Sequence, residues 1–363
     1  MNAVKLVSGR PLLITFTLCV ALLGLSELHP TTSGFGHFDL IMGATGGATR
    51  VSAGPPDTPT STFVDSFRNM MRSHPCHDVG TLREEFRRVF AEERLVDSLG
   101  RIEPFDKITT FLAHFYSGTS HPLLIDIGAN TGDVSERFVS FVCSRFAVSS
   151  SASPCGGRIF AYEPLASNMA MLEKQALQHN WQRAGFRAFR AALSSTGGGR
   201  NTSFFGSGVQ GSLEKANSFA VEGEAELVPV FTLDEHLDSV GEGSAPILLL
   251  KIDTEGLDAE VLKGSARLLR ERRATFIVFE YGLKLFPTTL NNTVQWLAEK
   301  LQGGLLCWLI TQAHLIPLTG HFWSDEYECW SFSNVICAQA DSPDAAILTG
   351  WWNARLRQPF GCV

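Results

Sequence analysis

The hydrophobic pattern divides the chain into a helical part and a part that alternates between strands and helices. From residue 81 to Gly100, apolar residues recur at helical spacing opposite many charged ones, which predicts an amphipathic helix. Beyond Pro122 the pattern changes to short apolar runs, each followed by a turn and an amphipathic segment. Such runs are typical of buried parallel strands with helices on both faces. The pattern predicts an α/β domain over residues 119–340.

The first of these runs ends in a glycine turn. Residues 123–127 read as a buried strand, Gly128 and Gly132 lie in the turn, and residues 133–146 read as a helix. Glycine permits close approach of the backbone to a ligand, and the helix N-terminus offers unpaired N–H groups. The turn therefore predicts a nucleotide site, although on its own a plain tight turn explains a GxxxG spacing equally well.

Carboxylates end three further strands of the same kind. Glu163 follows the second strand, Asp253 and Glu255 follow the strand "ILLLKI", and Glu280 ends "TFIVFE". Because the carboxyl ends of parallel strands meet at one edge of a sheet, we expect these side chains near the glycine turn. Glu163 has the position from which a carboxylate binds ribose hydroxyls, and the alternative is an exposed carboxylate at a strand end.

Four segments in this region together resemble the FkbM family of S-adenosylmethionine-dependent methyltransferases. They are "LLIDIGANTGDVSERF", "IFAYEPLASNMAMLEKQ", "FTLDEHL" and "LLLKIDTEGLDAEVLKGSARLL", in the order and spacing of the family. "KIDTEG" is the most family-specific block. The resemblance implies a Rossmann-like class I methyltransferase fold, with a seven-stranded, mostly parallel sheet, helices on both faces and an antiparallel final strand. S-adenosylmethionine is the implied cofactor.

The resemblance also implies roles for single residues. Glu163 would bind the ribose hydroxyls, Ala192 would border the adenine, and Asp253 would face the methyl group and the amino-acid end of the cofactor. The methionine and ribose part would lie against the glycine turn, at Asp126, Gly128, Asn130 and Gly132.

Methyl transfer to a hydroxyl needs an aligned acceptor and a route for its proton. Asp253 and Glu255 are the candidate proton acceptors, but the same carboxylates could orient the cofactor amine or cap the next helix. We expect no metal, because no Asp–Asn pair follows Glu280. Two other classes stay open: a catalytically inactive binding protein of this fold, and a nicotinamide-dependent oxidoreductase, although no YxxxK motif is present.

The N-terminus indicates entry into the secretory pathway. Lys5 and Arg10 precede an apolar run of about fifteen residues, which is short for a membrane span and typical of a signal peptide. We interpret residues 1–28 as a signal peptide or an uncleaved signal anchor, 29–62 as a flexible stem, 63–118 as a helical segment and 341–363 as a C-terminal tail. The protein is expected in the ER or Golgi membrane, held there only by this N-terminal segment, or secreted.

Composition agrees with that compartment. A net charge of −7 without a long basic run argues against a nucleic-acid partner. Secretory targeting favours a glycan or another small-molecule acceptor. Sequons occur at Asn201 and Asn291. Seven cysteines lie beyond Cys19, and this odd count leaves at least one thiol unpaired. In an oxidising lumen we expect one or two disulfides, with Cys143–Cys155 and Cys329–Cys362 as the candidate pairs. The oligomeric state is not predicted.

Overall fold

The structure is a computed structural model. It describes residues 83–84, 86–92, 104–116, 121–146, 155–207, 210–212, 226–282, 288–299, 304–311, 314–329 and 333–352. The predicted signal segment and stem lie outside these residues. Among the described helices, none combines the length and the apolar character that a membrane span requires.

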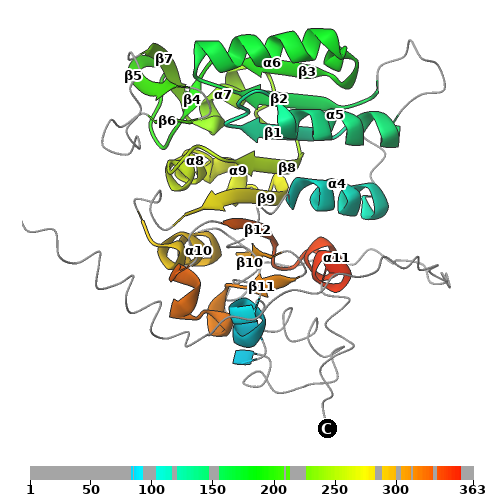
Figure 1. Ribbon diagram of the computed structural model, residues 1–363, viewed down its shortest axis with the longest axis vertical. Helices are drawn as coiled ribbons and strands as arrows, with labels where there is room; N and C mark the ends of the chain where they lie inside the picture. The colour runs from blue at the N-terminus through cyan, green and yellow to red at the C-terminus, as the bar shows by residue number, and fades with distance from the viewer. Residues whose placement is uncertain are drawn as a thin grey trace, which may run out of the picture. The chain divides into compact units, whose positions relative to one another are not determined.

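An eight-stranded sheet forms the centre of the fold (Figure 1). Its strands, in spatial order, are β11 (Leu315–Pro317), β10 (Leu305–Ile310), β12 (Ser333–Gln339), β9 (Ala274–Tyr281), β8 (Ile247–Ile252), β1 (Leu123–Ile127), β2 (Arg158–Tyr162) and β3 (Phe186–Phe189). The five strands from β9 to β3 are parallel, and β12 runs antiparallel to both of its neighbours. The predicted mostly parallel α/β fold with an antiparallel final strand is confirmed.

The strand count differs from the expected seven because β11 adds an edge strand. It has three residues and pairs antiparallel with β10, with Trp308 opposite Pro317. Proline lacks a backbone N–H and suits such an edge position. A run this short shows no alternation that a sequence pattern could detect.

Helices flank the sheet, with α4, α5 and α11 on the right in Figure 1 and α8, α9 and α10 on the left. Helix α11 lies in the segment that we expected to be a tail. The helices are α4 (Pro104–Phe115), α5 (Asp133–Phe146), α6 (Ala166–Gln178), α7 (Leu233–Ser239), α8 (Asp258–Gly264), α9 (Ala266–Arg270), α10 (Leu290–Glu299) and α11 (Pro343–Trp352).

Local chemistry explains where two of these helices begin. Helix α5 starts directly after Gly132, and it buries Phe138, Phe141 and Val142. Helix α7 starts with a capping box, in which Thr232 and Glu235 each accept a hydrogen bond from the backbone N–H of the other at 3.1 Å. The "FTLDEHL" segment therefore encodes its own helix start.

A second, smaller sheet was not predicted. Its order is β4 (Ala192–Leu193), β7 (Glu226–Phe231), β5 (Arg200–Ser207) and β6 (Gln210–Ser212). Side chains from this sheet and from the start of α6 form a small apolar cluster of their own, made of Leu165, Ala192, Phe204, Val228 and Val230. This cluster borders the site described below.

The described part of the predicted N-terminal helix contacts the C-terminal half of the chain. Phe86 lies edge-on to Phe322, with ring centroids 6.2 Å apart, and Phe90 lies 4.8 Å from Tyr327 in the same way. Both phenylalanines are buried, as their apolar face predicted. The helix therefore covers the segment between β11 and β12.

Two disulfides lie among the described residues. Cys143–Cys155 is confirmed and closes the connection between α5 and β2. Cys307–Cys337 links directly opposite residues of β10 and β12, and we had not predicted this pair. The predicted Cys329–Cys362 pair includes a residue outside the described part of the chain and stays a prediction.

Candidate functional site

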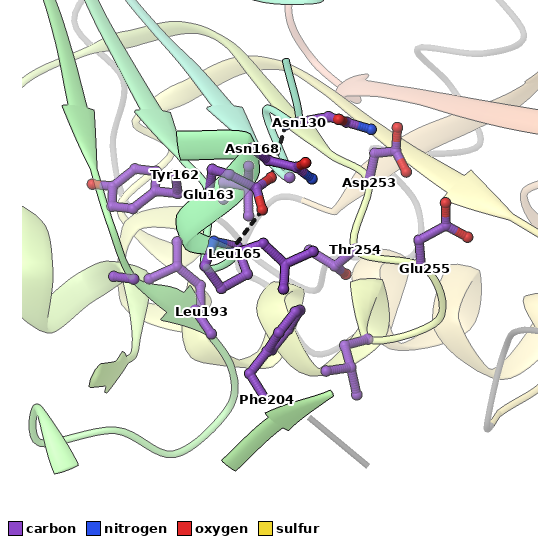
Figure 2. A pocket seen from close by; sticks show the side chains of 16 residues that line it. Asn130, Tyr162, Glu163, Leu165, Asn168, Leu193, Phe204, Asp253, Thr254 and Glu255 are labelled. Atoms are coloured by element: carbon purple, nitrogen blue, oxygen red, sulfur yellow. Dashed lines mark hydrogen bonds between the residues drawn. The ribbon is translucent and has the colours of Figure 1, made fainter. Parts of the chain in front are cut away.

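A pocket opens at the carboxyl ends of β1, β2 and β8 (Figure 2). This is the place where the strand order reverses, since β2 and β8 lie on opposite sides of β1. Ligands bind at such switch points in open α/β sheets. The pocket encloses about 660 Å³ of empty space, part of it open to solvent, and is lined by Ile127, Gly128, Asn130, Tyr162, Glu163, Pro164, Leu165, Asn168, Ala191, Ala192, Leu193, Phe204, Asp253, Thr254, Glu255 and Leu257.

Glu163 is fixed by the backbone on both sides of it. Its carboxylate accepts hydrogen bonds from the N–H of Asn130 at 2.8 Å and of Leu165 at 2.9 Å (Figure 2). The residue is 4% exposed, and burial raises the pKa of its carboxyl, while the two N–H groups oppose that rise. A carboxylate oriented in this way is ready to accept further hydrogen bonds from a ligand in the pocket.

Gly128 is required by the close approach of two chain segments. Its φ is +74°, and a Cβ at this position would lie 1.7 Å from the carbonyl oxygen of Asp253. No larger residue fits while the end of β8 stays where it is. The glycine turn thus brings the ends of β1 and β8 together at the pocket.

Below the turn lies a buried ion pair. The Nζ of Lys251 is 2.9 Å from Asp126 Oδ1 and donates a hydrogen bond to the carbonyl of Gly128 at 2.8 Å. The second oxygen of Asp126 accepts from Ser135 Oγ at 2.6 Å. Burial alone would lower the pKa of Lys251, but the neighbouring carboxylates Asp126 and Asp253 outweigh burial and raise it. Lys251 therefore stays charged and holds the turn from beneath.

Asp253 and Glu255 lie across the pocket from Glu163 (Figure 2). Asp253 Oδ2 is 3.5 Å from Lys251 Nζ, and its side chain is 39% exposed. Glu255 has a φ of +53°, which is uncommon for a residue other than glycine. Thr254 points its Oγ1 at Asp258 Oδ2, at 2.9 Å, so the segment is tied to the start of α8.

Six of the eight predicted site residues line the pocket: Gly128, Asn130, Glu163, Ala192, Asp253 and Glu255. The other two do not. Asp126 is fully buried in the ion pair beneath the turn. Gly132 has a φ of +107°, and a Cβ there would meet Leu172 at 2.8 Å and Trp181 at 2.9 Å, so this glycine serves helix packing.

Sequence patterns did not reveal two kinds of pocket residue, nor the lysine that lies beneath the pocket. The apolar wall of Leu165, Phe204 and Leu257 comes from three separate elements, and no local pattern joins them. Asn168 lines the pocket from the first turn of α6 and is 2% exposed. Lys251 had a signal that could have found it, because a single lysine inside a fully buried strand needs a buried anionic partner.

The charged side chains that line the pocket are all acidic. Its lining includes three carboxylates, Glu163, Asp253 and Glu255, and no lysine, arginine or histidine. Such a lining favours a positively charged ligand. Among the described residues, no group of three or more His, Cys, Asp or Glu side chains is arranged to hold a metal ion.

One family model matches part of the chain. The family model "Methyltransferase FkbM domain" matches residues 126–301. No curated protein sequence matches the chain. Solved structures similar to it include the methyltransferase FkbM from Methylobacillus flagellatus KT, at 14% identity and a TM-score of 0.35, over 62% of this chain and 47% of that one. The chain thus spans about half the length of that relative.

Two other similar structures come from different bacteria. One is a putative rRNA methylase from Clostridium thermocellum, at 7% identity and a TM-score of 0.35, over 66% of this chain and 98% of that one. The other is a putative methyltransferase from Streptococcus mutans in complex with SAH, at 10% identity and a TM-score of 0.35, over 66% and 99%. The similarity to the FkbM family lies in residues 126–301.

Proposed function

Because the chain carries an FkbM methyltransferase domain over residues 126–301, we propose that it transfers a methyl group from S-adenosylmethionine to a hydroxyl of a glycan or a secreted metabolite in the secretory pathway. The methyltransferase class and the cofactor follow from the family. The hydroxyl acceptor and the compartment are our inference.

One observation supports the proposal most strongly: two carboxylates face each other across the pocket from the ends of β2 and β8. Glu163, oriented by two backbone N–H groups, would accept hydrogen bonds from the ribose hydroxyls. Asp253 would lie on the side of the methyl group. A carboxylate-lined pocket without a basic residue suits a sulfonium cation.

The remaining lining also fits this cofactor. Leu165, Phe204 and Leu257 form an apolar wall where an adenine ring could lie, next to Ala192. The space above Gly128 stays open because this residue has no side chain. When bound, S-adenosylmethionine supplies an electrophilic methyl group, so that its carbon–sulfur bond breaks as the carbon–oxygen bond forms, and the acceptor proton needs a base.

Asp253 is the better placed of the two candidate bases. Its carboxylate lies 3.5 Å from the Lys251 ammonium, and its backbone N–H donates a hydrogen bond to the carbonyl of Ile127 at 3.0 Å. A side chain that is 39% exposed can take a proton from an acceptor hydroxyl and release it to water. Glu255 lies two residues further along the chain, on a turn where its φ is +53°.

Compartment and acceptor class rest on separate support. The N-terminal apolar run is typical of a signal segment, and disulfides such as Cys143–Cys155 form in oxidising compartments. The acidic pocket lining opposes a phosphate-rich acceptor such as RNA. A neutral polyhydroxyl compound meets no such repulsion.

Calorimetric titration with S-adenosylmethionine and with NAD tests the cofactor first. We expect heat of binding with the former alone; binding of NAD alone would support an oxidoreductase. Release of S-adenosylhomocysteine is then screened over glycans with free hydroxyls. Cofactor binding without turnover over that set would favour the inactive binding protein.

The variant Asp253→Asn tests the step itself. It keeps the shape of the side chain and removes its charge and basicity, so turnover should fall on the order of 10²-fold or more while the protein stays folded. If Asp253 takes the proton, cofactor affinity falls less than turnover. A folded Asp253→Asn protein with wild-type turnover would remove this carboxylate from methyl transfer.

A further inference from the structure

Glu280 lies next to Asp253 but outside the pocket lining. The pairing of β8 with β9 places Ile252 opposite Phe279, so that the residues which follow, Asp253 and Glu280, are neighbours at the carboxyl edge of the sheet. Glu280 is 5% exposed. Its Oε2 is buried and has no hydrogen-bond partner among the described residues. A carboxyl group in this position needs an explanation.

Two donors near Glu280, Thr254 and Lys251, are already committed to other acceptors. Asp258 accepts from Thr254 Oγ1 at 2.9 Å and Thr254 N at 3.3 Å with one oxygen, and from the backbone N–H of Glu280 at 3.1 Å with the other. Lys251 is closest to Asp126 and to the carbonyl of Gly128. These contacts stabilise Asp126 and Asp258 as acceptors, and they leave the Glu280 side chain without a donor among the described residues.

The charges around Glu280 also disfavour a negative charge on its carboxyl group. The groups that face Glu280 are Lys251 from β8, Asp253 and Glu255 from the turn after it, and Asp258 from α8. From β12 the opposite residue is Asn334, which is uncharged. One buried cation faces four carboxyl groups here, and adjacent buried carboxylates cannot all ionise. Burial, the charge of Asp253 and a hydrogen bond with Asp253 all raise the pKa of Glu280 far above its usual range.

We propose that Glu280 is a neutral carboxylic acid that donates a hydrogen bond to Asp253 and so positions the carboxylate on the reacting side of the pocket. This role rests on the proposed function, in which Asp253 receives the acceptor proton. During the reaction that proton passes from the acceptor oxygen to Asp253, and Glu280 keeps its own. Glu280 is therefore a positioning residue. It prevents Asp253 from turning fully towards Lys251.

Infrared spectroscopy tests the neutral acid without any ligand. At neutral pH the wild-type protein should show the C=O stretch of a buried protonated carboxyl group, and Glu280→Gln should lack it. Glu242→Gln is the matched control, because Glu242 is ion-paired with Arg158 and its replacement should leave the band in place. A wild-type spectrum without the band, or a band that persists in Glu280→Gln, would overturn the proposal.

Asp253→Asn tests the hydrogen bond itself. An amide oxygen accepts a weaker hydrogen bond than a carboxylate, so the band of Glu280 should move to higher frequency. An unmoved band would show that Glu280 does not donate to Asp253. Because no cofactor is added, this result is independent of S-adenosylmethionine binding, whose failure would instead refute the proposed function.

The pH dependence of stability gives a second readout. An acid that stays protonated in the folded protein and ionises in the unfolded chain makes folding less favourable as pH rises above about 4.3. The melting temperature of the wild type should therefore fall relative to that of Glu280→Gln between about pH 5 and pH 9. Parallel curves would contradict a neutral Glu280. In turnover, Glu280→Gln keeps a donor and should lose little, whereas Glu280→Ala should lose about tenfold or more.

Discussion

The clearest test of the pocket is the removal of the Glu163 carboxylate. In the structure both of its oxygens face backbone N–H groups, at 2.8 and 2.9 Å, and the side chain is 4% exposed. A ribose hydroxyl that donates to this group would form a charge-assisted hydrogen bond, worth about 1.5–3 kcal/mol. Glu163→Ala should therefore weaken S-adenosylmethionine binding by about 1.5–3 kcal/mol, or about 10- to 150-fold.

The same change also affects the folded protein without ligand. It leaves the N–H groups of Asn130 and Leu165 without their acceptor, at a cost of about 1–3 kcal/mol for each group that stays buried and unpaired. The variant also removes the buried Glu163 carboxylate, whose burial is itself unfavourable, and this gain offsets part of the cost. The melting temperature must therefore be measured beside the affinity, so that loss of fold is not mistaken for loss of a contact.

Glu235→Ala is a matched control for this experiment. Glu235 also accepts from two backbone N–H groups, those of Thr232 and Gly198, both at 3.1 Å, but it does not line the pocket. Calorimetry should show unchanged cofactor affinity in Glu235→Ala and weakened affinity in Glu163→Ala. Equal affinities for wild type and a folded Glu163→Ala protein would show that Glu163 does not bind the ribose.

Three further predictions concern the fold and its modification. Gly128→Ala should lower the free energy of unfolding, measured in urea, by about 3 kcal/mol or more, because the added Cβ would overlap the Asp253 carbonyl. The control Gly198→Ala should lower it by only about 1–2 kcal/mol, because Gly198 also has a positive φ of +88° but lies in open space. Loss of the Cys143–Cys155 disulfide, which spans 12 residues, should lower stability by about 3 kcal/mol; an unchanged melting temperature in the double serine variant would contradict this. In a secretory host, Asn201→Gln should increase gel mobility through loss of a glycan, since Asn201 lies exposed on β5. Asn291→Gln should leave the mobility unchanged, because Thr293 of that sequon is buried.

Local signals were sufficient for the strands and the glycine turn that meet at the pocket. The apolar runs of β1 and β8, the glycine turn and the helix after it follow from the order of residues over one short stretch each, because side-chain periodicity and glycine content act locally. The carboxylates Glu163 and Asp253 could be placed at one edge as well. Parallel strands that alternate with helices leave no other arrangement for residues at their carboxyl ends.

Contacts between distant segments were beyond such signals. β11 and the small sheet with Phe204 form through strand pairings that the local sequence of a short strand or a loop does not predict. Cys337 had several possible partners, and the pairing of β10 with β12 selected Cys307. A strand sequence shows that a residue is buried, but not which residue lies opposite.

Asp126 shows the difference between what local sequence predicts and what contacts between distant segments decide. Its sequence position next to the glycine turn suggested contact with the cofactor, and the chain alone determined that an acidic residue would end a buried strand there. The register of β1 with β8 places it opposite Lys251, so that the two charges pair beneath the pocket. The sequence determined which chemical groups reach this edge of the sheet, because strand order along the chain places them there. Only the tertiary structure decided which groups neutralise one another and which face the ligand, because strand register determines the distances between charges.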